Sequence, residues 1–271
     1  MSEPAGEPGV LAALAARYAY WLGLPDDETT AAAEEDDPAR VRAMPVILRF
    51  ERATPPGRTD LLEAAAAAAV AVCLDPRAEP GGEWHDDLVA WTSANIRKVS
   101  RRARGVHWQA VADLPGRTIT VGGAEARALV PGLVADLPKE VTRLQISGSD
   151  LPADELPSPP AAGQPVLWLN PTVPMTVGKA AAQVGHGTML LAALTSGSRR
   201  DAELAEWAAD DCRCAVRTAS GARWAELTPL LAEPVTAWEK HGLVMVRDAG
   251  FTEVAPGTAT VAAEWPLPLS R

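Results

Sequence analysis

An internal repeat constrains the fold of this chain more than any other feature of its sequence. A shift of 116 residues aligns residues 88–108 with residues 204–224 without a gap, and seven of the 21 positions are identical. The identical residues are Leu88, Trp91, Arg97, Arg101, Ala103, Gly105 and Trp108, which match Leu204, Trp207, Arg213, Arg217, Ala219, Gly221 and Trp224. Chance similarity in a compositionally biased chain is the alternative, but two of the pairs are tryptophans, a rare residue. The repeat therefore predicts two related halves.

Both halves show the same order of predicted elements: an apolar strand, a long alanine-rich helix, and a tryptophan-bearing helical segment that leads into a second strand. The strands and long helix lie at 45–50, about 95–101 and about 59–74 in the first half, and at 165–170, about 211–217 and about 177–194 in the second. A helix near 228–241 and strands at 243–247 and 258–264 follow. This alternation predicts an α/β fold made of two related three-layer units with mixed, roughly four-stranded sheets. The chain would then be an internal duplication, a pseudo-dimer.

Two stretches of unusual composition divide the chain. Residues 9–23 predict a short amphipathic helix, and the acidic stretch from Asp26 to Asp37 indicates a solvated tether. The Pro- and Ala-rich run at 152–165 is typical of an interdomain linker. We therefore expect a helix and tether at 1–44, a first domain at 45–152, a linker at 153–164 and a second domain at 165–271.

The net charge of −10 does not exclude a polyanionic partner, because most of it belongs to one segment. Residues 1–44 carry −6, whereas residues 45–160 and 161–271 carry −2 each. The N-terminal residues show neither the basic start nor the apolar stretch typical of a signal peptide, no run of about 18 apolar residues occurs, and the three cysteines are too few for a disulfide framework. These features predict a cytoplasmic protein that does not bind a membrane.

The segment from Met175 to Met189 carries the first candidate site. Lys179, Gln183 and His186 are spaced i, i+4 and i+7, so one helical face carries all three. The flanking glycines at 185 and 187 each cost a helix about 1 kcal/mol relative to alanine, which predicts a close approach to the helix backbone there. A surface Lys and Gln with a core His is the alternative.

A second candidate site follows the predicted strand at 243–247. Asp248 and Thr252 bracket a turn in which Gly250 can adopt a positive φ, and ordinary turn chemistry is the alternative. The chain has no P-loop, no nucleophile elbow and no zinc-binding histidine pair. We therefore expect no cofactor and no metal.

Together these two segments resemble the type-2 peptidyl-tRNA hydrolases. The matching motifs are Gly178-Lys179-x-x-Ala182-Gln183-x-x-His186 and Asp248-Ala-Gly-x-Thr252-x-x-Ala255-Pro256-Gly257-x-x-Thr260-Val261. The resemblance spans about residues 165–266 and implies a mixed-sheet α/β domain that hydrolyses the ester between a peptide and the tRNA 3′ ribose. It also implies a set of functional residues: Lys179, His186, Asp248 and Thr252, with Gly178 and Gln183 at the substrate.

The chain departs from this family's pattern at three positions. Val177 stands where a second lysine is usual, Phe251 replaces an arginine, and Glu264-Trp-Pro replaces an apolar-Gly-Pro tail. The two missing cations should weaken phosphate contacts unless another part of the chain supplies them. In the first half Leu62-Glu63 replaces the Gly-Lys pair and no equivalent of His186 is visible, which predicts a degenerate copy.

Five cations of the first half could supply the missing charge. They are Arg97, Lys98, Arg101, Arg102 and Arg104, with no acid among them. In a strand and its turn, Arg97 and Arg101 share one face, and Arg102 and Arg104 the other. We expect this patch to hold the tRNA backbone; a solvated turn with ordinary surface bases is the alternative.

The leading hypothesis is hydrolysis of peptidyl-tRNA, with tRNA as the partner, by a monomeric pseudo-dimer or a weak homo-oligomer. Water would attack directly, with Asp248 or His186 as the base and Lys179 at the oxyanion or a phosphate. Thr252 would orient the water or Asp248, and Gln183 would contact the terminal adenosine or the peptide. Lys179 and Asp248 are expected to be at least partly exposed. The alternatives are a non-catalytic tRNA-binding or interaction protein, and an amide or ester hydrolase of small substrates.

Overall fold

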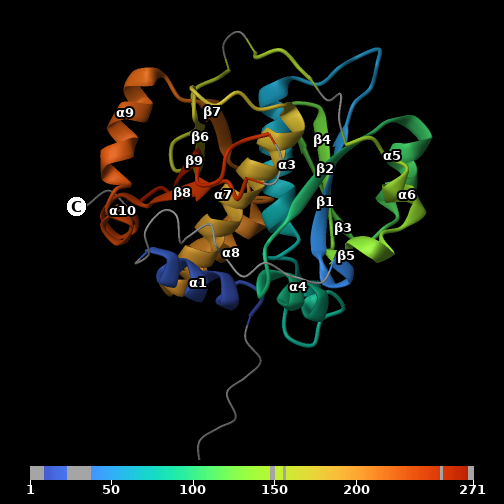
Figure 1. The fold of residues 1–271 in the computed structure, drawn as a ribbon, viewed down its shortest axis with the longest axis horizontal. Coiled ribbons are helices and arrows are strands. Elements are labelled where there is room, and N and C mark those ends of the chain that lie inside the picture. Colours follow the sequence, from blue (N-terminus) through green and yellow to red (C-terminus); the bar gives the residue numbers. More distant parts are fainter. Residues whose placement is uncertain (1–8, 23–37, 147–149, 155–156, 251–252, 268–271) are drawn as a thin grey trace, which may run out of the picture.

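Two mixed β-sheets, one in each half of the chain, form the framework of the protein (Figure 1). The computed structural model describes residues 9–22, 38–146, 150–154, 157–250 and 253–267. Helix α1 (Ala12–Leu22) precedes both sheets. The first half contains η1 (Pro38–Arg40), β1 (Arg42–Arg49), α3 (Arg58–Ala71), η2 (Pro76–Ala78), α4 (His85–Thr92), β2 (Lys98–Ala103), α5 (Gly105–Ala112), β3 (Gly116–Val121), β4 (Ala124–Leu129), β5 (Gly132–Leu133), η3 (Val134–Asp136) and α6 (Lys139–Thr142). The second half contains β6 (Val166–Leu169), α7 (Val177–Gly197), α8 (Asp201–Ala209), β7 (Ala215–Thr218), α9 (Gly221–Leu230), α10 (Pro234–His241), β8 (Leu243–Arg247) and β9 (Ala259–Glu264).

The two sheets have the same topology. The strand order is β2-β1-β4-β3 in the first half and β7-β6-β9-β8 in the second. In each sheet the first two strands of this order are parallel, and the other neighbours pair antiparallel. The short strand β5 pairs with β1 and is the fifth strand of the first sheet. The predicted fold class, two α/β units with mixed sheets of about four strands, is confirmed.

Each sheet lies between two layers of helices because its central strands are apolar on both faces. In β1, Val46 and Leu48 join the central core with α3 and α7, whereas Ile47 between them packs with residues of α5 and α6. In β6, Leu167 faces the central core and Trp168 packs with residues of α9. Figure 1 accordingly shows α3 and α7 in the middle, with α5 and α6 on one outer side and α9 and α10 on the other. None of the helices in the described ranges combines the length and apolar character needed to cross a bilayer.

Helices α3 and α7 pack against each other and join the two halves. Small residues permit this contact: residues 64–69 of α3 are all buried alanines, and a Cβ at Gly185 of α7 would lie 3.0 Å from the Cβ of Ala69. The Thr188 hydroxyl donates a hydrogen bond to the Ala66 carbonyl oxygen, 2.7 Å away. At residue 187 a Cβ would lie 2.4 Å from the Leu167 side chain. The close approach to the helix backbone at both glycines is thus confirmed.

The repeated tryptophans make the same hydrogen bond in each half. Trp91 in α4 donates from Nε1 to the carbonyl oxygen of Arg97 at 3.1 Å, and Trp207 in α8 donates to that of Arg213 at 2.8 Å. Both donors and both acceptors are separated by 116 residues. The repeat therefore relates like elements, and the origin of the two halves by duplication stays a prediction.

Some predicted element boundaries are wrong by a few residues. The second strands begin later than expected, at residues 98 and 215. In the second half this is because Asp211 and Cys212 adopt positive φ values of 51° and 55° and turn the chain first. The helix expected over 228–241 is two helices, since α9 ends just after Pro229 and Pro234 begins α10.

Candidate functional site

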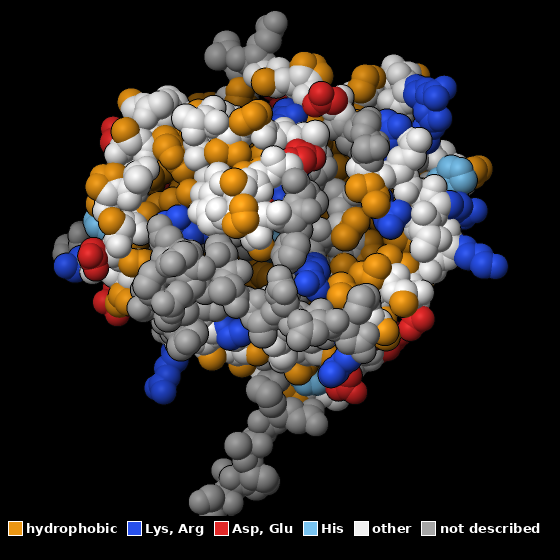
Figure 2. All heavy atoms as spheres, viewed as in Figure 1, with side chains coloured by type: hydrophobic (Ala, Val, Ile, Leu, Met, Phe, Trp, Pro, Cys, Tyr) orange, Lys and Arg blue, Asp and Glu red, His pale blue; other side chains and the backbone are white. Residues whose placement is uncertain are grey.

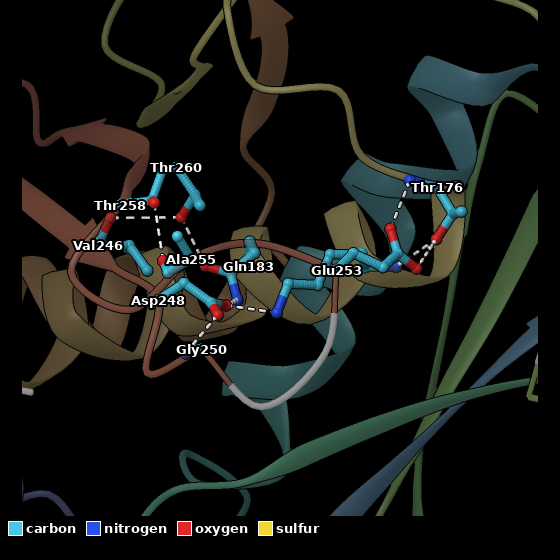
Figure 3. A network of polar contacts seen from close by, with 10 residues as sticks. Thr176, Gln183, Val246, Asp248, Gly250, Glu253, Ala255, Thr258 and Thr260 are labelled. Carbon is cyan, nitrogen blue, oxygen red and sulfur yellow. Dashed lines mark hydrogen bonds and ion pairs between the residues drawn. The ribbon is translucent and has the colours of Figure 1, made fainter.

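The first turn of α7 and the loop after β8 meet at the candidate site (Figure 3). Thr176 caps α7, because its Oγ1 accepts a hydrogen bond from the Lys179 backbone N–H at 3.2 Å. The same hydroxyl donates to Oε1 of Glu253 at 2.7 Å, and the Thr176 N–H donates to Oε2 of Glu253 at 3.1 Å. These contacts tie the loop to the start of α7 and place Asp248, which directly follows β8, beside Lys179.

The Asp248 carboxylate accepts hydrogen bonds from three donors. Its Oδ2 is bonded to the ammonium group of Lys179 and to Nε2 of Gln183, the latter at 2.8 Å. Its Oδ1 accepts from the Gly250 N–H at 2.8 Å. Gly250 has a φ of 83°, and a Cβ there would lie 2.3 Å from Cγ of Pro256, so this turn requires glycine. The carboxylate is therefore held in one orientation beside a positive charge.

Gln183 connects this carboxylate to strand β9. Its Oε1 accepts a hydrogen bond from the Thr260 hydroxyl at 2.5 Å, which directs Nε2 toward Asp248. The Gln183 side chain is buried and both ends of its amide are bonded within the protein, whereas the sequence predicted a contact with substrate. Thr260 belongs to the second motif, but the sequence analysis gave it no role. Its position in the strand that pairs with β8 could have indicated that it lies near Asp248.

Lys179 and Asp248 form a buried ion pair. Their side chains are 10% and 4% exposed, respectively. The expectation of partial exposure is wrong for Asp248, which is buried, and is met by Lys179, which stays partly exposed. Removing one partner of a buried pair typically costs about 3–5 kcal/mol, since the other charge is left uncompensated. Substitutions here are expected to affect stability as well as chemistry.

His186 points to a different partner. Its Nδ1 lies 3.1 Å from Nζ of Lys98, at the start of β2 in the first half. Burial, and then the charges of Lys98 and Lys179, hold the pKa of His186 well below its usual value, so the imidazole is neutral. The structure thus brings Lys179, Gln183 and Asp248 together and directs His186 to the contact between the halves.

The first half also borders the start of α7. A Cβ at Gly178 would lie 3.6 Å from Cβ of Ser100 and 3.8 Å from the carbonyl oxygen of Ile146. Val177, where the family usually has lysine, is fully buried in the central core. A cation at position 177 would therefore have to enter that core.

The described residues leave out part of the second motif and were also searched for groups that could bind a metal. Thr252 and Phe251 lie outside the described residues. Within the described ranges, no three or more His, Cys, Asp and Glu side chains are grouped so that they could hold a metal ion.

The five basic residues of the first half have different surroundings. Lys98 is directed toward α7, while Arg101 donates to the carbonyl oxygen of Leu144 at 2.9 Å. Arg102 donates to Oε1 of Gln145 at 2.9 Å. Arg104 is exposed and Arg97 is partly buried. Figure 2 shows Lys and Arg side chains at several places on one face of the molecule, with the largest group at the edge over α5.

The corresponding position in the first half carries the opposite charge. Asp60 is the third residue of α3, as Lys179 is of α7. Asp60 lies against Gly122, which follows β3 as Asp248 follows β8; a Cβ at Gly122 would lie 2.1 Å from Oδ2 of Asp60. Counting from the helix starts thus pairs Asp60 with Lys179, whereas the offset of 116 residues pairs Glu63 with it.

Comparison with protein families gives a match to the second half. Residues 164–271 match the family model described as Peptidyl-tRNA hydrolase PTH2, a stretch that covers less than half of the chain. No solved structure matches the chain significantly. The second half is thus similar to the peptidyl-tRNA hydrolases of this family, over the segment that contains the Lys179–Asp248 pair.

Proposed function

We propose that the second half hydrolyses the ester bond between peptide and tRNA in peptidyl-tRNA. The observation that carries this proposal is the buried Lys179–Asp248 pair, oriented by Gln183, inside the segment that matches the family. Asp248 lies 69 residues from Lys179 and 65 from Gln183 along the chain, yet all three share one hydrogen-bonded network. Motif residues that converge in this way support a working site.

Ester cleavage requires an activated water, a stabilised oxyanion and protonation of the leaving ribose oxygen. Asp248 is the carboxylate that takes the proton of the attacking water and returns it to the ribose oxygen as that oxygen leaves. Lys179 stabilises the oxyanion or contacts a phosphate beside it, and Thr252 orients the water or Asp248. His186 is the less suitable base, because its Nδ1 is already bonded to Lys98.

The direct test is to incubate the full chain with a peptidyl-tRNA and with an aminoacyl-tRNA and to follow the release of free tRNA. We expect release from the wild type and from Lys139→Ala, an exposed lysine of α6, and its loss in Lys179→Ala. If the wild type releases tRNA from neither substrate, the enzyme proposal is overturned.

A non-catalytic tRNA-binding protein is the alternative, and the burial of Val177 in place of a lysine favours it. This protein would bind tRNA in a salt-sensitive manner without turnover. A hydrolase of small amides or esters would instead show turnover that tRNA does not inhibit. Binding and turnover measured on one preparation therefore separate the three functions.

We further propose that the chain is an internal duplication that works in the cytoplasm as a monomeric pseudo-dimer. The domains would span 45–152 and 165–271, joined by 153–164, with the first a degenerate copy. The shared strand order and the paired tryptophan hydrogen bonds support this proposal. Sedimentation should give the mass of one 28.5 kDa chain; a stable dimer would contradict it.

A further inference from the structure

Lys98 is held at the contact between the halves by two helices, α7 and α4. Its Nζ lies 3.1 Å from Nδ1 of His186 in α7 and 5.0 Å from the ring centroid of Trp91 in α4. Its stem crosses α7 at Gly185, where a Cβ would lie 3.2 Å from Cδ and 3.3 Å from Cε of Lys98. Glycine at position 185 thus makes room for the stem, and the tryptophan ring supports the ammonium group.

The chemistry of this contact determines which ring nitrogen of His186 carries the proton. Below about pH 7 Lys98 carries its proton, and an ammonium group can only donate a hydrogen bond, so Nδ1 must accept it and be unprotonated. A neutral imidazole then carries its single proton on Nε2. The lowered pKa of His186 agrees with this assignment, because a charged ring would carry protons on both nitrogens.

We propose that Lys98 of the first half is a positioning residue for the site of the second half: it donates to Nδ1 of His186 and holds the ring in the Nε2–H tautomer. This inference rests on the proposed hydrolase function. In that reaction His186 offers a hydrogen-bond donor, and Asp248 is the only one of the two candidate bases that can accept a proton. The first half is then needed for the site as well as for the fold.

The surroundings of Lys98 include few other titratable groups. The thiol of Cys73, in the turn after α3, is close enough to interact with the Lys98 charge, but burial raises the pKa of Cys73 to about 12, so the thiol stays neutral. Lys179, on the same helix as His186, adds a second positive charge that disfavours a charged ring. Burial lowers the pKa of Lys98 to about 7, so the ammonium form is present in slightly acidic solution.

The first test is ¹⁵N NMR of the His186 ring in the full chain at about pH 6.5, near the ordinary pKa of histidine. His186→Gln identifies the signals. We expect the wild type to show a protonated Nε2 and a bare Nδ1, and Lys98→Met to move both signals toward the average of two exchanging tautomers. Lys139→Met, which replaces an exposed lysine of the same half, should leave both signals unchanged.

A proton on Nδ1 in the wild type, or unchanged signals in Lys98→Met, would overturn the proposal. The wild-type spectrum decides even if Lys98→Met does not fold.

The second test measures turnover of peptidyl-tRNA. Lys98→Met should lower kcat by about tenfold, less than the roughly hundredfold cost of losing an acid–base group, because His186 stays in place, and should leave KM within about twofold. Combined with His186→Gln it should cause little further loss, because the two residues act through one contact. A change in KM alone would overturn the positioning role. A wild type that is inactive but shows the expected ring signals would overturn the hydrolase function and leave the Lys98–His186 assignment standing.

Discussion

The two halves share one strand order but differ in charge at the same point of the fold. In the second half Lys179, in the first turn of α7, meets Asp248 after β8. In the first half Asp60, in the first turn of α3, meets Gly122 after β3. The scaffold therefore does not create the site, since only one of its two copies carries an oriented ion pair at this point. The difference makes the first half an internal control for the second.

The largest expected effect is on turnover by the second half. Lys179→Ala and Asp248→Asn should each lower the rate by about a hundredfold or more, the usual scale for a positioned electrostatic or acid–base group. Asp60→Asn, at the matching point of the first half, should leave the rate within about twofold. Single-turnover release of tRNA measures both, and circular dichroism checks that the variants are folded. Equal losses at both points would show that the first half also carries chemistry.

A smaller effect is expected on tRNA binding by the first half. Replacing Arg101, Arg102 and Arg104 by Ala should weaken binding and reduce the slope of log affinity against log salt by about one for each phosphate that is no longer neutralised. Because Arg101 and Arg102 bond to other groups of the first half, the reduction should be less than about three. Filter binding at several salt concentrations gives the slope. An unchanged slope would leave the first half without a role in holding the tRNA backbone.

The paired tryptophans test whether the halves are equivalent in stability. Trp91→Phe and Trp207→Phe each remove one indole hydrogen bond to a backbone carbonyl, and each should cost about 1–2 kcal/mol of unfolding free energy. Urea denaturation measures both costs. A cost confined to one of the two variants would show that the matched hydrogen bonds are not equivalent.

A further expected effect is a dependence of stability on pH that belongs to the Lys98–His186 contact. Between about pH 7 and its ordinary pKa of 10.5, Lys98 binds a proton in the unfolded chain but not in the folded one, so stability should rise with pH there. Below pH 6.5 His186 binds a proton only when unfolded, so stability should fall as the solution is acidified.

Urea denaturation of the wild type and of Lys98→Met/His186→Gln between about pH 5.5 and 8.5 isolates this contribution. The upper limit avoids the cysteines, because burial raises the pKa of Cys73 and Cys212 to about 12 and gives them an opposite trend in alkaline solution. The double variant should lose the rise with pH that the wild type shows. Parallel curves of unfolding free energy against pH for the two proteins would argue that folding shifts the pKa of neither Lys98 nor His186.

The scaffold and part of the site could be predicted from sequence because their signals are local or repeated. The offset of 116 residues predicted two like units, and spacing on one helical face predicted that Lys179 and Gln183 would act together. Both side chains do reach Asp248. The strands β3 to β5 were not predicted, since short strands with mixed composition lack a clear alternation.

What could not be predicted depends on how the halves pack. His186 and Lys98 are 88 residues apart and meet only because α7 crosses the edge strand of the other sheet. The sequence presented Lys98 as one of five surface cations, since strand alternation does not reveal which face another domain will cover. The relation between α3 and α7 is also hard to read from sequence, because these helices start 119 residues apart, at Arg58 and Val177, whereas the tryptophans are 116 residues apart.

The contact between Lys98 and His186 also depends on the two halves being one polypeptide. The position that matches Lys98 in the second half is Cys214, which is buried. In an assembly of identical subunits every substitution appears twice, so a lysine introduced for one catalytic centre would also be imposed on the symmetry-related location. A covalently joined pair escapes this coupling: one copy can give up its own chemistry and evolve as a dedicated accessory to the other.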